Sequence, residues 1–119
     1  MFKILITKTK KKMINKINID CKEWFDNLNG NSYFAGTIQI NDKETFLIPF
    51  NYGYGSQYEQ EAKAILTQFN KISCDYGQNL RTYCKENNIE LISNIKEYCK
   101  ERELKEIEKN YNNLITKNN

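Results

Sequence analysis

The residues with the clearest chemical potential lie at positions 51–59, where tyrosines and glycines alternate just before a helical pattern begins. Backbone N–H groups at a helix start, with the positive end of the helix dipole, attract an anion. A tyrosine ring beside them could stack on a base or anchor a protein partner. The candidate binding residues are Tyr52, Gly53, Tyr54, Gly55, Ser56 and Gln57, with Tyr33 on a neighbouring strand.

The same stretch also has a purely structural interpretation. The two glycines tolerate unusual φ/ψ angles, so they could simply let the chain turn from strand to helix. They lack the spacing of a phosphate-binding loop, and no lysine follows them. Both interpretations stay open here. Tyr52 and Tyr54 are expected to be exposed, whereas Trp24 and Tyr58 are expected to pack in the core.

The chain offers little for catalysis or metal binding. It has no histidine, and no serine or cysteine lies in a known nucleophile motif. Its four cysteines form no C-x-x-C pair, so a zinc site would need all four as ligands. We therefore expect a protein that is not an enzyme and that holds neither a metal nor a cofactor.

Positive charge is concentrated at the start of the chain. Residues 1–12 form a basic N-terminal extension, which is either a contact for nucleic acid or another anionic partner, or a solvated, disordered arm. Residues 17–119 carry a net charge of −3, which is unlike a domain that coats DNA. The cluster that could contact nucleic acid consists of Lys8, Lys10, Lys11 and Lys12.

Residues 13–119 are predicted to form a single α+β domain, because a chain of this length builds one core. Alternating apolar and polar residues predict strands at 13–19, 32–41, 44–50 and 89–96. The sequence Asn-Asp-Lys at 41–43 is typical of a tight hairpin turn. Pro49 marks the end or edge of a strand, on which Phe46, Ile48 and Phe50 are expected to share one face.

Helices are predicted from capping signals and from apolar residues at helical spacing. Asp20 with Glu23 predicts a short helix over 21–28, and Ser56 with Glu59 predicts a long one over 57–71. A shorter helix is expected at 79–87. A C-terminal amphipathic helix from residue 97 packs either on its own sheet or on a second copy of the chain, giving a homodimer.

These elements predict a small antiparallel sheet of three to four strands packed against one long amphipathic helix, with further C-terminal helices. The sequence has no secretory signal and no apolar run near the ~20 residues that cross a bilayer. We therefore expect no membrane partner, and a reducing interior in which the thiols stay free.

Three segments resemble one group of small proteins encoded by tailed bacteriophages. They are Trp24-Phe25-Asp26, residues 29–34 (Asn-Gly-Asn-Ser-Tyr-Phe) and residues 49–59, which begin Pro-Phe-Asn-Tyr-Gly-Tyr-Gly. The resemblance covers roughly residues 13–72, and more weakly 89–104, but not the lysine-rich extension or the longer helical C-terminus. It implies a phage or prophage product acting in the cytoplasm of the bacterial host.

Two functional hypotheses follow. The first is a non-enzymatic binding protein that inhibits or redirects a host factor, such as a component of an anti-phage defence system, in the manner of an anti-CRISPR protein. The target would be a protein or a nucleoprotein complex. The second is a nucleotide- or nucleic-acid-binding accessory protein, which would use the tyrosine-glycine loop, the helix start and the basic arm.

Overall fold

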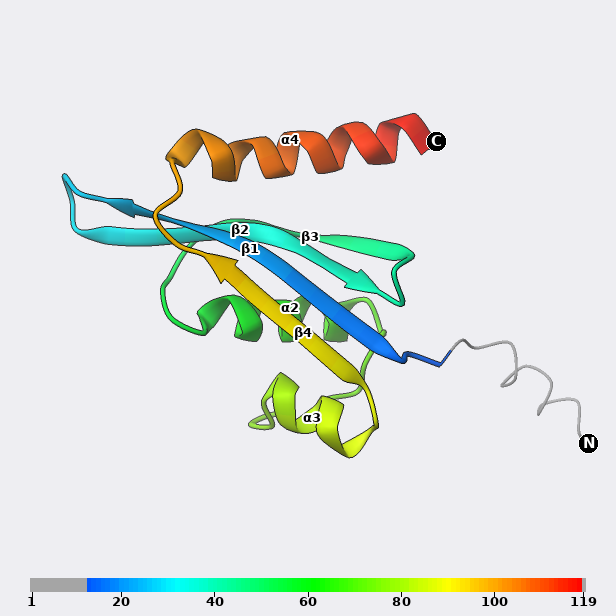
Figure 1. Ribbon diagram of the computed structural model, residues 1–119. Helices are drawn as coiled ribbons and strands as arrows, with labels where there is room; N and C mark the ends of the chain where they lie inside the picture. The colour runs from blue at the N-terminus through cyan, green and yellow to red at the C-terminus, as the bar shows by residue number, and fades with distance from the viewer. Residues whose placement is uncertain (1–12, 119) are drawn as a thin grey trace, which may run out of the picture.

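The computed structural model describes residues 13–118, and these form three layers (Figure 1). A four-stranded sheet with the order β3-β2-β1-β4 lies in the middle. Helix α4 (Glu101–Asn118) covers one face, while α2 (Gln57–Gln68) and α3 (Leu80–Glu86) cover the other. The predicted α+β class is confirmed.

The sheet is mixed, so the prediction of an antiparallel sheet is wrong for one strand. β1 (Lys16–Asp26), β2 (Asn31–Ile40) and β3 (Glu44–Tyr52) pair in antiparallel fashion, but β4 (Glu90–Lys96) lies parallel to β1. The chain between β3 and β4 passes along one face as α2 and α3, and such a crossover returns a strand in the parallel direction. The first strand also begins later than predicted, at Lys16.

The helix predicted over residues 21–28 is wrong, because β1 continues as a strand through this segment. Trp24 pairs with Tyr33 and Phe25 with Ser32, so cross-strand aromatic packing outweighs the local capping signal. Asp26 braces the turn instead of a helix. Its carboxylate accepts the N–H of Leu28 at 3.0 Å, and its carbonyl accepts the N–H of Gly30 at 2.7 Å.

The predicted turn at 41–43 is confirmed. Asn41 and Asp42 have φ values of 52° and 59°, and Lys43 donates its N–H to the carbonyl of Ile40 at 2.9 Å. Two consecutive positive φ angles define the type I′ turn that suits the twist of a hairpin, and Asn and Asp adopt them with the least strain.

Each face of the sheet has its own core. The larger core lies under α2 and α3 and contains Ile17, Ile19, Ile38, Ile48, Leu66, Leu80 and Cys84. The smaller core lies under α4 and contains Ala35, Cys99 and Leu104, with Trp24, Tyr33, Phe50 and Ile107 packed against it. The sheet is therefore apolar on both faces.

Phe50 belongs to the smaller core, so the prediction that it shares a face with Phe46 and Ile48 is wrong. Gly36 pairs with Ile48 and Phe34 with Asn51, which gives β3 one residue more than β2 over this interval. This is a β-bulge, and the extra residue moves the following side chains to the opposite face. Pro49 lies at the bulge, where its missing N–H costs no ladder hydrogen bond.

The helices differ from prediction in length and capping. α2 ends at Gln68 rather than at residue 71, and α4 is the longest helix, with 18 residues. Ser56 makes no side-chain capping bond, so the predicted box with Glu59 is wrong. The helix predicted at 79–87 is confirmed as α3, which begins where the Asn79 side chain accepts the N–H of Thr82 at 2.8 Å.

The C-terminal helix lies along its own sheet (Figure 1). Leu104 is fully buried, Ile107 packs against the smaller core, and the Tyr111 hydroxyl donates to the carbonyl of Thr45 at 3.2 Å. Further along α4, Leu114 and Ile115 are exposed. The first turns of the apolar face are thus occupied by contacts within the chain.

Candidate functional site

Four aromatic side chains form a continuous row on the face that carries α4. Tyr33 stacks on Trp24 with ring centroids 5.3 Å apart and on Phe50 at 5.2 Å, and it meets the edge of Tyr52 at 5.8 Å. We call these four residues the aromatic platform. These centroid distances and the angles between the rings are typical of favourable aromatic pairs, so each ring restricts the side-chain rotation of its neighbours.

Local backbone structure assembles the platform from three strands. β1 and β2 place Trp24 opposite Tyr33, and the bulge in β3 turns Phe50 and Tyr52 toward the same face. The ammonium group of Lys105, on α4, lies 5.6 Å from the centre of the Phe50 ring. This cation–π contact covers the platform on the side of the helix.

The loop after β3 is held tightly, although Tyr54 within it is exposed. Gly53 is buried and donates its N–H to the carbonyl of Ser32 at 3.0 Å. A Cβ atom there would lie 2.7 Å from the Phe34 ring. The Tyr54 N–H is bound by the side-chain carbonyl of Gln57 at 2.9 Å. Gly53 and Gln57 thus hold the loop in place.

The tyrosines at the end of β3 and in this loop are exposed to solvent. Tyr52 is 56% exposed and Tyr54 is 62% exposed, whereas most of Tyr33 lies against its stacked neighbours. Gly55 and Ser56 are also exposed. The platform thus combines a rigid base with exposed rings at its margin.

Further apolar side chains are exposed at this end of the sheet, where the β1–β2 hairpin projects (Figure 1). Leu28 at the hairpin tip is 95% exposed, and Phe25 and Tyr98 are exposed as well. Tyr98 is held beside the hairpin because the next residue, Cys99, donates its N–H to the carbonyl of Glu23 at 2.9 Å. We call the platform, with these residues and Tyr54, the aromatic end.

The structure brings together some of the predicted residues and separates others. Tyr33 and Tyr52 are in contact, and Trp24 joins them, although it is only partly buried. Tyr58 is buried on the opposite face, where its hydroxyl is 2.9 Å from the hydroxyl of Ser93. The predicted cluster Lys8, Lys10, Lys11 and Lys12 lies outside the described residues.

Sequence reasoning missed Phe50 as a member of the site. The alternation rule assigned it to the wrong face because the rule assumes an unbroken ladder. The available signal was Pro49, since proline inside a strand pattern marks an edge or a bulge.

A second polar cluster joins α2, α3 and β4. The Glu59 carboxylate, whose side chain is 12% exposed, accepts hydrogen bonds from Arg81 at 2.7 and 3.1 Å and from the Ser93 hydroxyl at 2.6 Å. A groove of about 590 Å³ lies beside it, between α2 and α3. Because Glu59 is saturated by its own neighbours, we assign the cluster to holding these elements together.

The cysteines are poor nucleophiles in this environment. Burial raises the pKa of the Cys21 thiol to about 12 and that of Cys84 to about 11, so both remain protonated at neutral pH. Burial also raises the pKa of Cys74. Within residues 13–118, no three Cys, Asp or Glu side chains are grouped to hold a metal ion.

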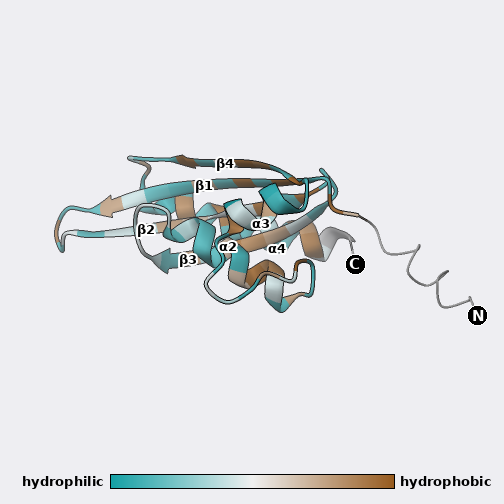
Figure 2. Ribbon diagram, turned by 90° about the horizontal axis from the view of Figure 1, so that it is seen from below, coloured by the Kyte–Doolittle hydropathy of each residue, from teal (hydrophilic) through white to brown (hydrophobic). Residues whose placement is uncertain are grey.

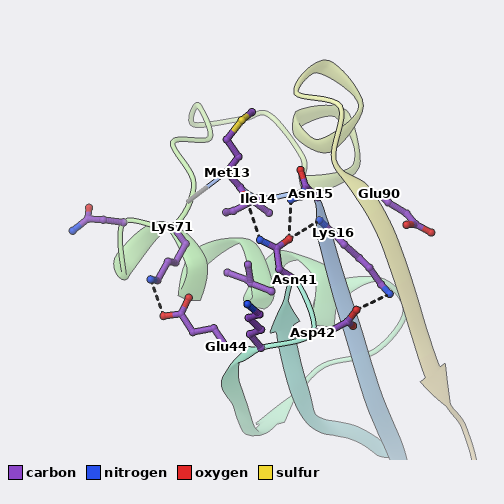
Figure 3. Close-up of a pocket in the computed structure, with 12 residues that line it drawn as sticks. Met13, Ile14, Asn15, Lys16, Asn41, Asp42, Glu44, Lys71 and Glu90 are labelled. Carbon is purple, nitrogen blue, oxygen red and sulfur yellow. Dashed lines mark hydrogen bonds and ion pairs between the residues drawn. The ribbon is translucent and has the colours of Figure 1, made fainter. Parts of the chain in front are cut away.

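A large hollow lies at the opposite end of the sheet, around the β2–β3 turn (Figure 3). It has a volume of about 1100 Å³. The Asn41 side chain accepts the N–H groups of Asn15 and Lys16 at 2.8 and 3.1 Å, and it donates to the carbonyl of Met13 at 2.9 Å. We call this region the Asn41 end.

None of the helices in the described part of the chain is long and apolar enough to span a membrane. Compared with known protein families, with curated proteins and with solved structures, the chain shows no significant match to any of them.

Proposed function

We propose that this chain is a non-enzymatic binding protein that engages a partner protein through the aromatic end. The observation that carries the proposal is the contact of exposed Tyr52 with the stacked rings of Trp24, Tyr33 and Phe50, with Tyr54 exposed two residues further along the chain. Tyrosine and tryptophan dominate the energetics of protein interfaces. Rings that are already stacked lose little conformational entropy when a partner binds.

Electrostatics favour a basic partner surface. Residues 17–119 carry a net charge of −3. At the aromatic end, Glu23 is partly buried beside Glu97, and burial together with this like charge raises the pKa of Glu23. A cation from a partner would relieve that repulsion, which gives charge complementarity at the binding surface.

The class of partner follows from the resemblance to phage-encoded proteins. A small phage protein that binds without catalysis acts by occupying a surface that its target needs. We therefore propose a bacterial host protein, such as a component of an anti-phage defence system, as the target that is inhibited or redirected in the host cytoplasm.

The proposal is tested by purifying host proteins on the immobilised chain and comparing three forms of it. The first is the wild type, the second carries Tyr52→Ala and Tyr54→Ala, and the third carries Tyr76→Ala as a matched control. Tyr76 is fully exposed in the segment between α2 and α3, remote in sequence from the platform.

We expect the double variant to bind the captured target at least about tenfold more weakly, since interface tyrosines commonly contribute more than ~1 kcal/mol each. The control should bind as the wild type does. Nuclease treatment and salt titration separate protein binding from nucleic-acid binding, which weakens steeply with salt. Undiminished binding by a folded double variant would contradict the proposal.

A further inference from the structure

The two edges of the sheet differ in how they meet the solvent. β3 forms one edge and is interrupted by Pro49 and its bulge, a device that discourages pairing with another strand. β4 forms the other edge and runs for seven residues without a proline, and its register with β1 is unbroken. In Figure 2, β4 lies at the margin of the molecule, and neither α2 nor α3 extends past it.

The pairing with β1 determines which backbone groups of β4 point outward. Glu90 donates its N–H to the carbonyl of Asn15 at 2.9 Å, so the N–H and C=O of Glu90 point toward β1. Along a strand these directions alternate with each residue. The outward N–H and C=O groups therefore belong to Leu91, Ser93 and Ile95.

We propose that β4 is the interface of a homodimer, in which β4 of a second copy adds to it in antiparallel orientation and extends the sheet across both copies. The two-fold axis passes between the two Ser93 residues. In this register, Leu91 lies opposite Ile95 of the second copy. The outward N–H and C=O groups of Leu91, Ser93 and Ile95 then face the outward groups of Ile95, Ser93 and Leu91 of the second copy. Hydrogen-bonded antiparallel pairs require this arrangement.

The side chains of β4 are self-complementary in the same register. Glu90 lies opposite Lys96 of the second copy, so each dimer contains this ion pair at both ends of the interface. Neither residue has an ion-pair partner in the part of the chain that the structure describes. Leu91 and Ile95, which are partly buried against the larger core, would extend that core across the interface.

This charge pattern favours a second copy over an unrelated strand. β4 begins with an acidic residue and ends with a basic one. Only an antiparallel partner that carries the same pattern neutralises both ends, whereas a parallel copy would place like charges side by side. The strand is its own best complement. The proposal concerns β4 alone and does not depend on the function of the aromatic end.

Amide hydrogen exchange at two protein concentrations tests the geometry directly. In dilute solution, the amides of Ile92 and Asn94 should be protected by β1, while those of Leu91, Ser93 and Ile95 exchange freely. At high concentration the latter set should become protected. If the outward amides exchange at the same rate throughout the concentration series, the β4 interface is wrong.

Charge reversal tests the register by sedimentation equilibrium. Glu90→Lys or Lys96→Glu places like charges at both ends of the interface, so each variant should dimerise about tenfold more weakly or worse. An equimolar mixture of the two should form a heterodimer with both ion pairs restored, as should the double variant Glu90→Lys/Lys96→Glu with itself.

Matched controls carry the same charge changes on α4, at exposed Glu106 and Lys109. Glu106→Lys and Lys109→Glu should leave the dimerisation constant unchanged. The proposal is overturned if the wild type stays monomeric. It is also overturned if the charge changes at Glu90 and Lys96 leave the dimerisation constant unchanged. Capture of a strand from a different protein at β4 would also overturn it.

Discussion

The aromatic end and the Asn41 end lie at opposite ends of the same sheet. They differ in whether their side chains are bound to partners within the chain. At the Asn41 end, Lys16 pairs with Asp42 at 3.2 Å and Lys71 with Glu44 at 2.8 Å. Figure 3 shows these pairs around the hollow, together with the bonds of Asn41. At the aromatic end, apolar rings remain exposed and Glu23 is close to a like charge.

This difference shows why the size of a hollow does not identify a binding surface. The Asn41 end has a large hollow, but Asn41, Lys16, Asp42, Lys71 and Glu44 around it are already bound within the chain, and a ligand that used these groups would have to displace those bonds. The aromatic end leaves apolar side chains exposed. A partner there gains burial without breaking internal contacts.

The largest effect on stability is expected from Gly53→Ala, at the joint beneath the aromatic end. The new methyl group would lie 2.7 Å from the Phe34 ring, at a φ of 156°. Overpacking together with backbone strain should lower the free energy of unfolding by about 3 kcal/mol, as measured by denaturant titration.

Gly55→Ala is the matched control for this change. Gly55 has a φ of 65°, but nothing lies within 4 Å of its added Cβ. Its cost should therefore be only ~1 kcal/mol, from backbone strain alone. Equal costs for the two variants would mean that Gly53 is not packed against Phe34.

At the Asn41 end, Asn41→Ala should lower the free energy of unfolding by about 2 kcal/mol. The variant loses three hydrogen bonds to residues 13–16 and places alanine at a φ of 52°, which alanine adopts less readily than asparagine does. Asn41→Gly removes the same bonds but keeps the backbone unstrained, so it should cost less.

Both Asn41 variants should bind a partner of the aromatic end as well as the wild type does. If either one weakens binding without unfolding, the two ends are coupled, and the contrast between them is less complete than the structure indicates.

The smallest effect is expected from Glu97→Gln. Burial, then the charge of Glu97, raise the pKa of Glu23 above its ordinary value of 4.5. The folded state therefore binds a proton more readily than the unfolded state, so stability falls as pH rises from 4.5 through the raised pKa.

Removing the charge of Glu97 should lower the pKa of Glu23, as followed by NMR titration of its carboxyl carbon. It should also stabilise the protein at neutral pH by less than about 0.5 kcal/mol, with no gain at acidic pH where Glu23 is protonated. A gain that persists at acidic pH would point to a cause other than charge.

Local sequence patterns predicted the elements whose stability is local. The strands at 32–41, 44–50 and 89–96 follow from periodicity, and the turn at Asn41 and Asp42 follows from backbone preference. The start of α2 at Gln57 was predicted correctly, but from a capping box of Ser56 and Glu59 that does not form. The exposure of Tyr52 and Tyr54 could also be predicted, because they lie where the strand pattern ends and the loop begins.

Contacts between distant residues could not be predicted in this way. Asp20 and Glu23 mimic a helix start, and only the pairing of Trp24 with Tyr33 shows that the segment is a strand. Likewise, Glu59 resembles a capping residue, but Arg81 and Ser93 occupy its carboxylate. The platform required both the strand and the bulge, so only part of the candidate site could be predicted.

The parallel pairing of β4 with β1 also determines the order in which the strands can pair during synthesis. β1, β2 and β3 are neighbours in sequence and can assemble while the chain is still emerging from the ribosome. The outer edge of β1 is paired only after β4 has been synthesised. The register begins with Lys16 opposite Glu90, which follows 74 positions later. Contacts of such long range form late, so the nascent hairpins pass through a period with β1 as an open edge. Synthesis of the β4 segment therefore ends an interval in which the edge of β1 is exposed to chaperones or to other strands.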